Sequence, residues 1–434
     1  MSDGLPGATP LLRIYRGATR GLAPIAGFLA MRKLARHGVS PTRQRERMGH
    51  ASLPRPDGTL VWLHGASVGE SLSAVTLVSR MAAALPDAEF LITSGTATSA
   101  KLVEQRLPSR TRHQFAALDA PGPVRRFLKH WRPTAAIFVE SELWPVTLRD
   151  TRKTGAKLAL VNARLSTKSV ESWSKYPETA RSVMDLFSVL LTQNSEMATH
   201  LRKMGAAPDR IRPGSNLKAF SAPLPIDGAA LAQIRQQLAE RPVWVASSTH
   251  RGEEEVVLQA HRHLLNPRPD LCLVLAPRHP ERGDEVSRLV HDAGLSMSRR
   301  SHNESSEHGV QVYLADTLGE LGIWYALSPI VFLGGSLQPI GGHNPFEVAR
   351  ANAAVISGPG VQNFAETFDA LKVSGGAIEV SDAPSLAAAV DRWLTDASSL
   401  EQARAACSTL AARQDSALDG VVETLCRALE LNDG

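Results

Sequence analysis

The stretch Ile330–Arg350, IVFLGGSLQPIGGHNPFEVAR, decides which architecture the chain can adopt. Its first four residues are apolar and typical of a buried β-strand, two glycine pairs follow, and the last part has the pattern of a helix start. Asn344 stands at the expected N-cap, and Glu347 follows it at the spacing of a capping box. Glycines let a ligand approach the backbone, and the first N–H groups of a helix attract anions. The order strand, loop, helix therefore favours an anion site, with phosphate as the natural ligand.

A simpler interpretation is a well-capped helix, which would account for Asn344 and Glu347. It leaves His343, the four glycines and the long loop after the strand unexplained, so we favour ligand binding. The loop has neither the G-x-x-x-x-G-K-[ST] pattern of a P-loop nor the G-x-G-x-x-G pattern of a dinucleotide-binding fold. Both of those nucleotide sites are excluded.

Apolar runs typical of strands alternate with helix-like segments along most of the chain. The alternation stops once, at 219–228, where AFSAPLPIDG has two prolines and no period. Because strands that alternate with helices form parallel sheets covered on both faces, we predict an α/β protein with two Rossmann-like, doubly wound domains. Ligands of such sheets bind beyond the carboxyl ends of the strands. The expected strands are 60–64, 89–93, 112–116, 134–139, 157–161 and 188–192, then 243–246, 271–275, 311–314, 330–333, 354–356 and 377–380.

The 434 residues are enough for two domains of ordinary size. We expect a basic N-terminal segment at 1–50, a first domain at 51–218, a linker at 219–228 and a second domain at 229–434. The helices expected from Ser385 to Leu429 could cross back to the first domain.

Composition and charge narrow the class of protein. Hydrophobic residues make up 43% of the chain and charged residues 21%, as in soluble globular proteins. Three cysteines without a CxxC pair, Cys272, Cys407 and Cys426, indicate buried thiols in a reducing compartment. Residues 1–50 hold nine Lys or Arg and two acidic residues, a net charge of +7, so the rest of the chain sums to −2 within the total of +5. A nucleic-acid binder would spread basic residues over a working face, and we set nucleic acid aside.

Residues 11–29 have an amphipathic pattern. The longest uncharged run there, 21–31, has eleven residues, short of the roughly 20 that span a bilayer. No signal-peptide cleavage pattern follows an apolar core. The pattern favours a helix that lies on an anionic membrane surface, and a helix docked on the protein's own body is the alternative. On one helical face lie Leu11, Tyr15, Ala18, Leu22, Ile25 and Leu29, and on the opposite face Arg13, Arg16 and Arg20.

Acidic residues follow two strands of the first half. Glu70 comes after 60–64 in the sequence GASVGE, in the first turn of a long predicted helix, where a carboxylate also suits the helix dipole. Glu140 and Glu142 come directly after 134–139, where capping of the next helix is the alternative interpretation. An ionised carboxylate at such a strand end could accept a proton from a hydroxyl. Lys218, just before the linker, could present a cation to a cleft, although a solvated lysine is the simpler interpretation.

Polar groups also follow strands of the second half. Arg278 comes after 271–275 and is suited to bidentate binding of a phosphate. The hydroxyl-rich run after 243–246 and the loop 315–320 after 311–314 both lead into helices. A metal site is poorly supported, because no D-x-D occurs and His250, His279 and His343 show no ligand spacing. We expect metal-independent chemistry.

Taken together, the motifs GASVGE, ESELWP, VNARLS, NLK, SSTHRGEEE, APRHPER, DTLGEL, FLGGSLQPIGGHNPFE and GPGVQNF resemble the 3-deoxy-D-manno-octulosonic acid (Kdo) transferases. The resemblance extends from Leu60 to Leu371 with the blocks in the same order. It implies the GT-B fold and an inverting, metal-independent glycosyltransferase without a cofactor. The implied reaction moves Kdo from CMP-Kdo to a lipid A precursor in lipopolysaccharide biosynthesis, at the cytoplasmic face of the inner membrane.

The resemblance also implies roles for single residues. Glu70 corresponds to the proton acceptor of the family, and Glu142 and Lys218 to its charge-stabilising residues. The CMP contacts correspond to Pro277, Arg278, Leu318, Gly319, Glu320, Asn344, Pro345, Phe346 and Glu347. Two other functions stay open from the sequence: a GT-B transferase that uses a UDP-sugar, and a catalytically silent protein that binds a nucleotide sugar or a membrane surface. The number of Kdo units transferred, the acyl pattern of the acceptor and the oligomeric state are not encoded in any motif.

Overall fold

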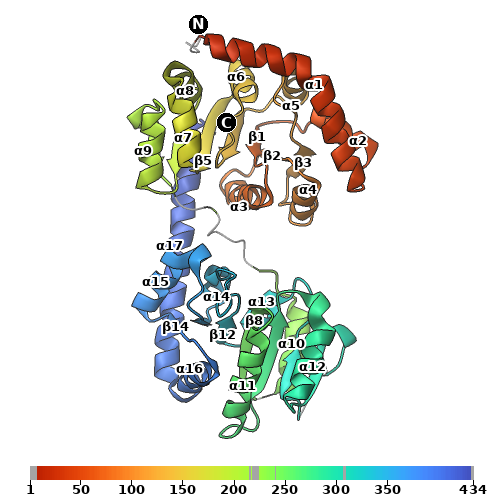
Figure 1. The fold of residues 1–434 in the computed structure, drawn as a ribbon, viewed down its shortest axis with the longest axis vertical. Helices are drawn as coiled ribbons and strands as arrows, with labels where there is room; N and C mark the ends of the chain where they lie inside the picture. The colour runs from red at the N-terminus through yellow and green to blue at the C-terminus, as the bar shows by residue number, and fades with distance from the viewer. Residues whose placement is uncertain (1–6, 215–216, 218–223, 240, 306–308, 432–434) are drawn as a thin grey trace. The chain divides into compact units, whose positions relative to one another are not determined.

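The computed structural model describes residues 7–214, 217, 224–239, 241–305 and 309–431 (Figure 1). The chain divides into two compact units, one formed by Met1–Phe220 and Asp415–Gly434 and the other by Ser221–Gln414. The linker expected at 219–228 lies partly outside the described residues, and its last residue, Gly228, begins a helix capped by Asp227. Residues 415–434 belong to the first unit. This agrees with the expectation that the last helices could cross back to the first domain, while the bounds given for the second domain, 229–434, included these residues.

The first unit is built on a parallel sheet of seven strands in the order β3-β2-β1-β4-β5-β6-β7. The chain therefore reverses its direction of winding between β1 and β4, which places a ligand crevice at their carboxyl ends. The strands are β1 (Leu60–His64), β2 (Glu89–Ser94), β3 (Thr111–Phe115), β4 (Ala135–Val139), β5 (Lys157–Ala163), β6 (Val189–Thr192) and β7 (Ile211–Pro213). The helices are α1 (Pro10–Arg36), α2 (Pro41–Gln44), α3 (Val68–Ala84), α4 (Ala97–Glu104), α5 (Pro121–Trp131), α6 (Pro145–Lys153), α7 (Thr167–Ser174), α8 (Pro177–Met184) and α9 (Ser195–Lys203).

The second unit repeats the plan with a parallel sheet in the order β10-β11-β9-β8-β12-β13-β14. Its winding reverses between β8 and β12. The strands are β8 (Val243–Thr249), β9 (Cys272–Pro277), β10 (Met297–Arg299), β11 (Val312–Leu314), β12 (Ile330–Leu333), β13 (Ala354–Ser357) and β14 (Ala377–Glu379). The helices are α10 (Gly228–Leu238), α11 (Glu253–Leu265), α12 (Gly283–Asp292), α13 (Leu321–Leu327), α14 (Pro345–Arg350), α15 (Ala365–Ser374), α16 (Ala383–Thr395) and α17 (Ala397–Ala428), whose last part belongs to the first unit.

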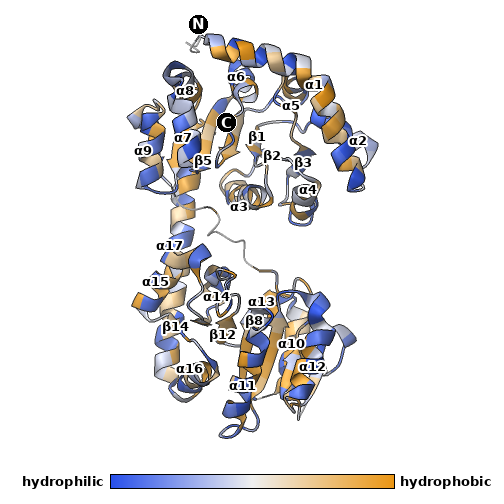
Figure 2. Ribbon diagram, in the orientation of Figure 1, coloured by the Kyte–Doolittle hydropathy of each residue, from blue (hydrophilic) through white to orange (hydrophobic). Residues whose placement is uncertain are grey.

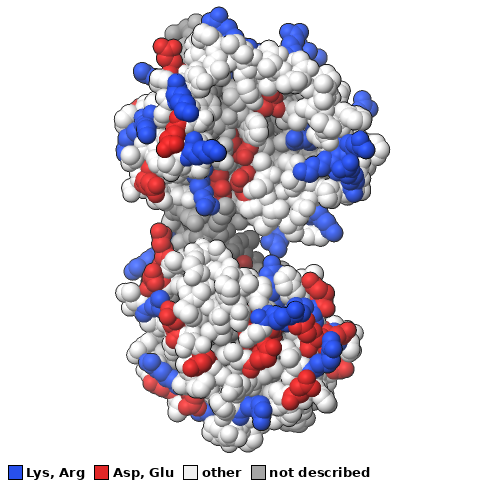
Figure 3. Space-filling model, in the orientation of Figure 1, with Lys and Arg blue, Asp and Glu red and all other residues white. Residues whose placement is uncertain are grey.

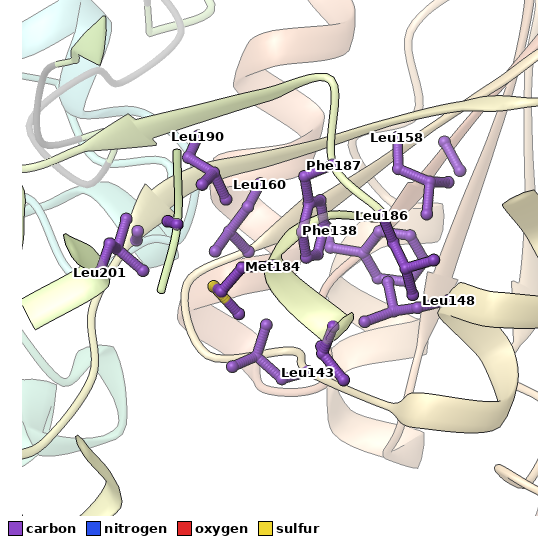
Figure 4. Close-up of a cluster of buried hydrophobic side chains, with 14 of the residues drawn as sticks. Phe138, Leu143, Leu148, Leu158, Leu160, Met184, Leu186, Phe187, Leu190 and Leu201 are labelled. Atoms are coloured by element: carbon purple, nitrogen blue, oxygen red, sulfur yellow. The ribbon is translucent and has the colours of Figure 1, made fainter. Parts of the chain in front are cut away.

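The predicted fold class is confirmed, and the twelve expected strands are all present. The edge strands β7 and β10 were not expected, because three residues are too few to show a period. The sheets are buried on both faces, as their continuous apolar runs predict, and Figure 2 shows hydrophobic strands beside helices of mixed character. Figure 4 shows part of the core on one face of the first sheet, where Phe138, Leu160 and Phe187 pack together.

The helix α1 packs on the first unit and also exposes an apolar face. Leu12, Ala23 and Leu34 are buried against the unit. Tyr15 donates its hydroxyl to Asp119 at 2.9 Å, and Arg16 pairs with Asp150 at 2.8 Å. Asp119 in turn accepts the backbone N–H of Thr147 at the start of α6. We expected Tyr15 on the apolar face of this helix that would lie on a membrane. Its hydroxyl instead donates to Asp119 within the first unit.

The last part of α17 completes the core on the other face of the first sheet. Leu418, Val422 and Leu425 pack there with residues of β1, β2 and β4.

Replacing the fully buried Leu425 with Ala removes apolar burial and leaves a cavity. We expect a loss of about 2–5 kcal/mol in the free energy of unfolding, measured by urea denaturation.

Val373→Ala is the control for this change, because Val373 is 90% exposed in the second unit. Its free energy of unfolding should change by less than about 0.5 kcal/mol. Equal stability of the two variants would show that the end of α17 does not support the first unit.

Candidate active site and nucleotide site

The carboxylate of Glu70 lies at the winding reversal of the first sheet, in the first turn of α3. A capping box holds it there: Ser67 accepts the N–H of Glu70, and Oε2 of Glu70 accepts the N–H groups of Ala66 and Ser67 at 2.7 and 3.1 Å. Gly65 allows this packing, since a Cβ at Gly65 would lie 2.7 Å from the backbone carbon of Glu70. The cap interpretation of Glu70 is therefore correct as geometry, and it leaves a role as proton acceptor open.

Glu142 follows β4 and is buried next to His64, the last residue of β1. His64 Nε2 lies 3.0 Å from Glu142 Oε2, and the indole N–H of Trp144 donates to the same oxygen. On its other side, His64 Nδ1 lies 2.9 Å from the hydroxyl of Thr93. Glu70 follows β1 and Glu142 follows β4, and the two carboxylates lie near each other because these strands are neighbours in the sheet.

The two carboxyl groups differ in their electrostatics. Burial raises the pKa of Glu70, and the nearby charges of Glu142 and Glu140 raise it further against the backbone hydrogen bonds. Burial also acts to raise the pKa of Glu142, but hydrogen bonds from His64 and Trp144 outweigh it, and the net shift of this pKa is downward. Of the two groups, Glu70 is therefore the one placed to take up a proton.

Two further polar residues lie at this strand edge: Glu140, which its place after a strand had indicated, and Asn162, which no sequence pattern indicated. Glu140 and Asn162 have φ angles of 62° and 55° directly after β4 and within β5, and such backbone conformations are concentrated at functional sites. Asn162 Nδ2 donates to Glu140 at 3.3 Å, and Asn162 Oδ1 accepts the N–H of Leu217 at 3.0 Å. Lys218 lies outside the described residues, so its predicted place in the site is not tested. Leu217, the residue before it, is buried in the first unit.

At the winding reversal of the second sheet, one buried carboxylate organises two loops. Glu253, the first residue of α11, accepts the N–H groups of Gly335, Ser336 and Leu337 at 2.7–3.0 Å and that of His250 at 2.9 Å. Gly334 lets the loops approach, since a Cβ there would lie 2.6 Å from the carbonyl oxygen of Ser248. Glu253 thus joins the loop after β8 to the loop after β12.

The residues matched to CMP contacts follow three strands of this unit. Pro277 ends β9, and Arg278 is exposed, with its backbone N–H bonded to Thr249 at 3.0 Å. Glu320 follows β11, and the hydrogen bond from Arg300 at 2.6 Å lowers its pKa. Leu318 is 79% exposed, and Gly319 has a φ of 84°.

Asn344 caps α14 by accepting the N–H of Phe346 at 3.1 Å, and Pro345 and Phe346 are buried. Because β9, β11 and β12 are parallel, all three loops lie at the carboxyl edge of one sheet.

Among the described residues, no group of three His, Cys, Asp or Glu side chains has the geometry to hold a metal ion. In the same part of the chain, no helix is long and apolar enough to cross a bilayer.

Comparison with known proteins assigns the chain to a family. The family model for 3-deoxy-D-manno-octulosonic-acid transferases matches residues 42–221. A probable mitochondrial 3-deoxy-D-manno-octulosonic acid transferase of Arabidopsis thaliana is 35% identical over 90% of this chain and 89% of its own length. The 3-deoxy-D-manno-octulosonic acid transferase of Haemophilus influenzae is 32% identical over 91% of this chain and 94% of its own length.

Among solved structures, a glycosyltransferase from Rickettsia africae matches 86% of this chain and 99% of its own, with a TM-score of 0.54 and 13% identity. At that identity the likeness supports the fold alone. The identities and coverage of the two transferases decide the family: the chain belongs to the 3-deoxy-D-manno-octulosonic acid (Kdo) transferases, which are glycosyltransferases.

Proposed function

We propose that the protein transfers Kdo from CMP-Kdo to a hydroxyl group of a lipid A precursor, with inversion at the anomeric carbon and without a metal ion. The observation that carries the proposal is the pair Glu70 and Glu142, two carboxyl groups at one strand edge whose pKa values are shifted in opposite directions. Such a split separates an acid–base role from a purely electrostatic one. Membership of the Kdo transferase family supplies the sugar.

In the proposed reaction, ionised Glu70 removes the proton of the acceptor hydroxyl while the oxygen attacks the anomeric carbon of Kdo. The bond from that carbon to the phosphate oxygen breaks, and CMP leaves with the bonding electrons. Attack from the face opposite CMP inverts the configuration. His64 and Trp144 keep Glu142 ionised, so its negative charge stays beside the centre where the sugar becomes electron-poor.

The second unit is proposed to hold the donor. Arg278 provides a guanidinium suited to phosphate, and the loops after β8, β11 and β12 lie at the same strand edge. Glu320, oriented by Arg300, and Glu347 in the first turn of α14 are acceptors suited to sugar hydroxyls. Lys218 is retained as a charge-stabilising residue on the strength of the family match alone.

We further propose that α1 places the protein on the cytoplasmic surface of the inner membrane, where a lipid acceptor resides. Its outward residues Leu22, Ile25 and Phe28 are 59–63% exposed, and so large an apolar face on a surface helix suits the acyl boundary of a bilayer. Next to it, a pocket between α1 and α6 is lined by Arg13, Arg16, Arg149 and Lys153. In Figure 3, Lys and Arg side chains predominate over Asp and Glu around α1 and α2. Anionic headgroups would be attracted to such a surface.

Glu70→Gln tests the proton acceptor. Gln keeps the shape and can still accept the capping hydrogen bonds, but it cannot take up a proton. We expect the single-turnover rate of Kdo transfer to fall by roughly 100-fold or more. The free energy of unfolding should drop by at most about 1 kcal/mol. In the unchanged protein, the transfer rate should decline as the pH falls through the raised pKa of Glu70, because protonation removes the base.

Glu196→Gln is the matched control, since Glu196 is an exposed first-turn residue of α9 without a place in the site. It should transfer Kdo at the normal rate. A Glu70→Gln protein that loses stability but transfers Kdo at nearly the normal rate would reduce Glu70 to a helix cap.

Arg278→Ala tests the donor site. Removing a charged partner of the phosphate should weaken CMP binding about tenfold or more, as measured by calorimetry. Arg288→Ala, an exposed change on α12, should leave the affinity unchanged. Tighter binding of UDP than of CMP to the unchanged protein would favour a UDP-sugar as donor and reject the proposed one.

Replacing Leu22, Ile25 and Phe28 together with Ser tests the membrane surface. Because these side chains point outward, the fold should survive, while binding to vesicles with phosphatidylglycerol should weaken at least about tenfold for the lost apolar burial. Replacing the exposed Ile226 and Val373 with Ser is the control. Vesicle flotation that does not differ between the two variants would contradict a role for α1.

A further inference from the structure

Two histidines in the second unit form a directly bonded pair. His250 follows β8, His343 lies in the loop before α14, and their Nε2 atoms are 2.9 Å apart. The rings are nearly parallel, with 10° between their planes and 5.2 Å between their centroids. At that distance one nitrogen must carry a hydrogen and the other must offer its lone pair, so the rings share a single proton between the two Nε2 atoms.

The surrounding loops are built around this pair. Glu253 accepts the N–H of His250 and, with the same oxygen, the N–H of Gly335 at 2.7 Å. Gly335 has a φ of 68°, and a Cβ there would lie 2.9 Å from the ring of His343. The carboxylate therefore fixes the backbone on both sides, and the glycine leaves the space that the His343 ring fills.

The groups that face the pair are mostly basic side chains, two of them arginines. In addition to burial, the electrostatic effect of Arg278, His279 and Arg282 lowers the pKa of His250. Arg278 and His279 lower the pKa of His343 in the same way, after burial and His250. The carboxylate that acts on His250 is Glu253, which already accepts four backbone N–H groups. Burial lowers the pKa of His250, and the basic side chains lower it further against the opposing effect of Glu253. Burial, followed by His250 and the basic side chains, lowers the pKa of His343 to about 4. The pair is therefore uncharged at neutral pH in the protein without a ligand.

One added proton changes which ring nitrogens of the pair can donate a hydrogen bond to a negative ligand. In the uncharged pair the donor ring has a bare Nδ1, and the acceptor ring carries its own hydrogen on Nδ1. One added proton goes to the bare Nδ1, so that both Nδ1 atoms become N–H donors while the bond between the Nε2 atoms is kept. Among the described residues neither Nδ1 has a hydrogen-bond partner. The Nε2–Nε2 distance of 2.9 Å and the centroid separation of 5.2 Å put the rings end to end, so the two Nδ1 atoms point away from each other. An anion beside one of them therefore gains one N–H donor and the positive charge of the added proton.

We propose that His250 and His343 belong to the anion site of the donor, and that the phosphate ester binds together with one proton taken up by the pair. This rests on the proposed use of a cytidine nucleotide by the second unit. Arg278 supplies a permanent charge at the site, and the pair adds a charge that exists only while the anion is bound. When the glycosidic phosphate becomes the phosphate monoester of free CMP, its second negative charge is met by that proton.

The test is the number of protons taken up with a phosphate ester that does not itself titrate. The methyl ester of cytidine 5′-monophosphate has one negative charge throughout the range from pH 5 to pH 8. Calorimetric titrations in buffers of different ionisation enthalpy give the protons taken up per ester bound. We expect uptake at pH 6. The affinity should fall by up to about tenfold per pH unit as the pH rises from the lowered pKa of the free pair towards the higher pKa that the bound anion gives it.

Two variants and a control separate the pair from the rest of the site. His343→Gln and His250→Gln should each abolish the uptake and flatten the pH dependence, while binding persists through Arg278. His291→Gln, an exposed change on α12, should keep the full uptake. Far-ultraviolet circular dichroism checks that each variant is folded.

Binding of the ester to the unchanged protein without proton uptake would overturn the proposal, and so would undiminished uptake in both folded variants. An ester that fails to bind at any pH would overturn the proposed donor site, and the histidine proposal with it. Binding without uptake overturns the histidine proposal alone, so the two failures are distinguishable.

Discussion

Both units depend on one constraint: where a parallel strand is followed by a helix, backbone N–H groups lack a partner within either element. In each unit a glutamate in the first turn of the helix accepts hydrogen bonds from such N–H groups. Glu70 accepts two N–H groups of its own loop, and Glu253 accepts one from its own loop and three from the loop after β12. The positions are equivalent in the two sheets, since each glutamate opens the helix after the strand beside the winding reversal.

The two glutamates differ in what remains for chemistry. Glu253 is fully buried and spends both oxygens on four backbone bonds, which suits a structural role. The two backbone bonds of Glu70 end on one oxygen, and burial raises its pKa, which suits a proton acceptor. Capping and the proposed catalysis are therefore compatible at Glu70, because the cap holds in place the carboxylate that the proposed reaction needs.

The sequence predicted the fold well, because periodicity marks long buried strands. It failed at β7 and β10, whose three residues carry no pattern. For the candidate site, the rule that function follows strand ends selected Glu70, Glu142 and Arg278, whose roles stay predictions. It could not find the bond between His64 and Glu142, because 78 residues separate them and the alternation of elements does not say that β1 lies beside β4. Glu253 was hidden in a run of three glutamates that looks like ordinary first-turn charge.

The electrostatics of the two strand edges fit the proposed division of the chemistry between the units. At the edge of the first sheet Glu140 and Glu142 lie near Glu70, and this group of carboxylates suits the proposed removal of a proton from a sugar hydroxyl. At the edge of the second sheet Arg278, His279, His250 and His343 lie near one another, which suits the proposed binding of a phosphate. A glycosyl transfer needs a base for the nucleophile and a cationic setting for the leaving group. Each unit is suited to one of these tasks and poorly suited to the other. Carboxylates would repel the phosphate, and cations would lower the pKa of the group that must accept the proton.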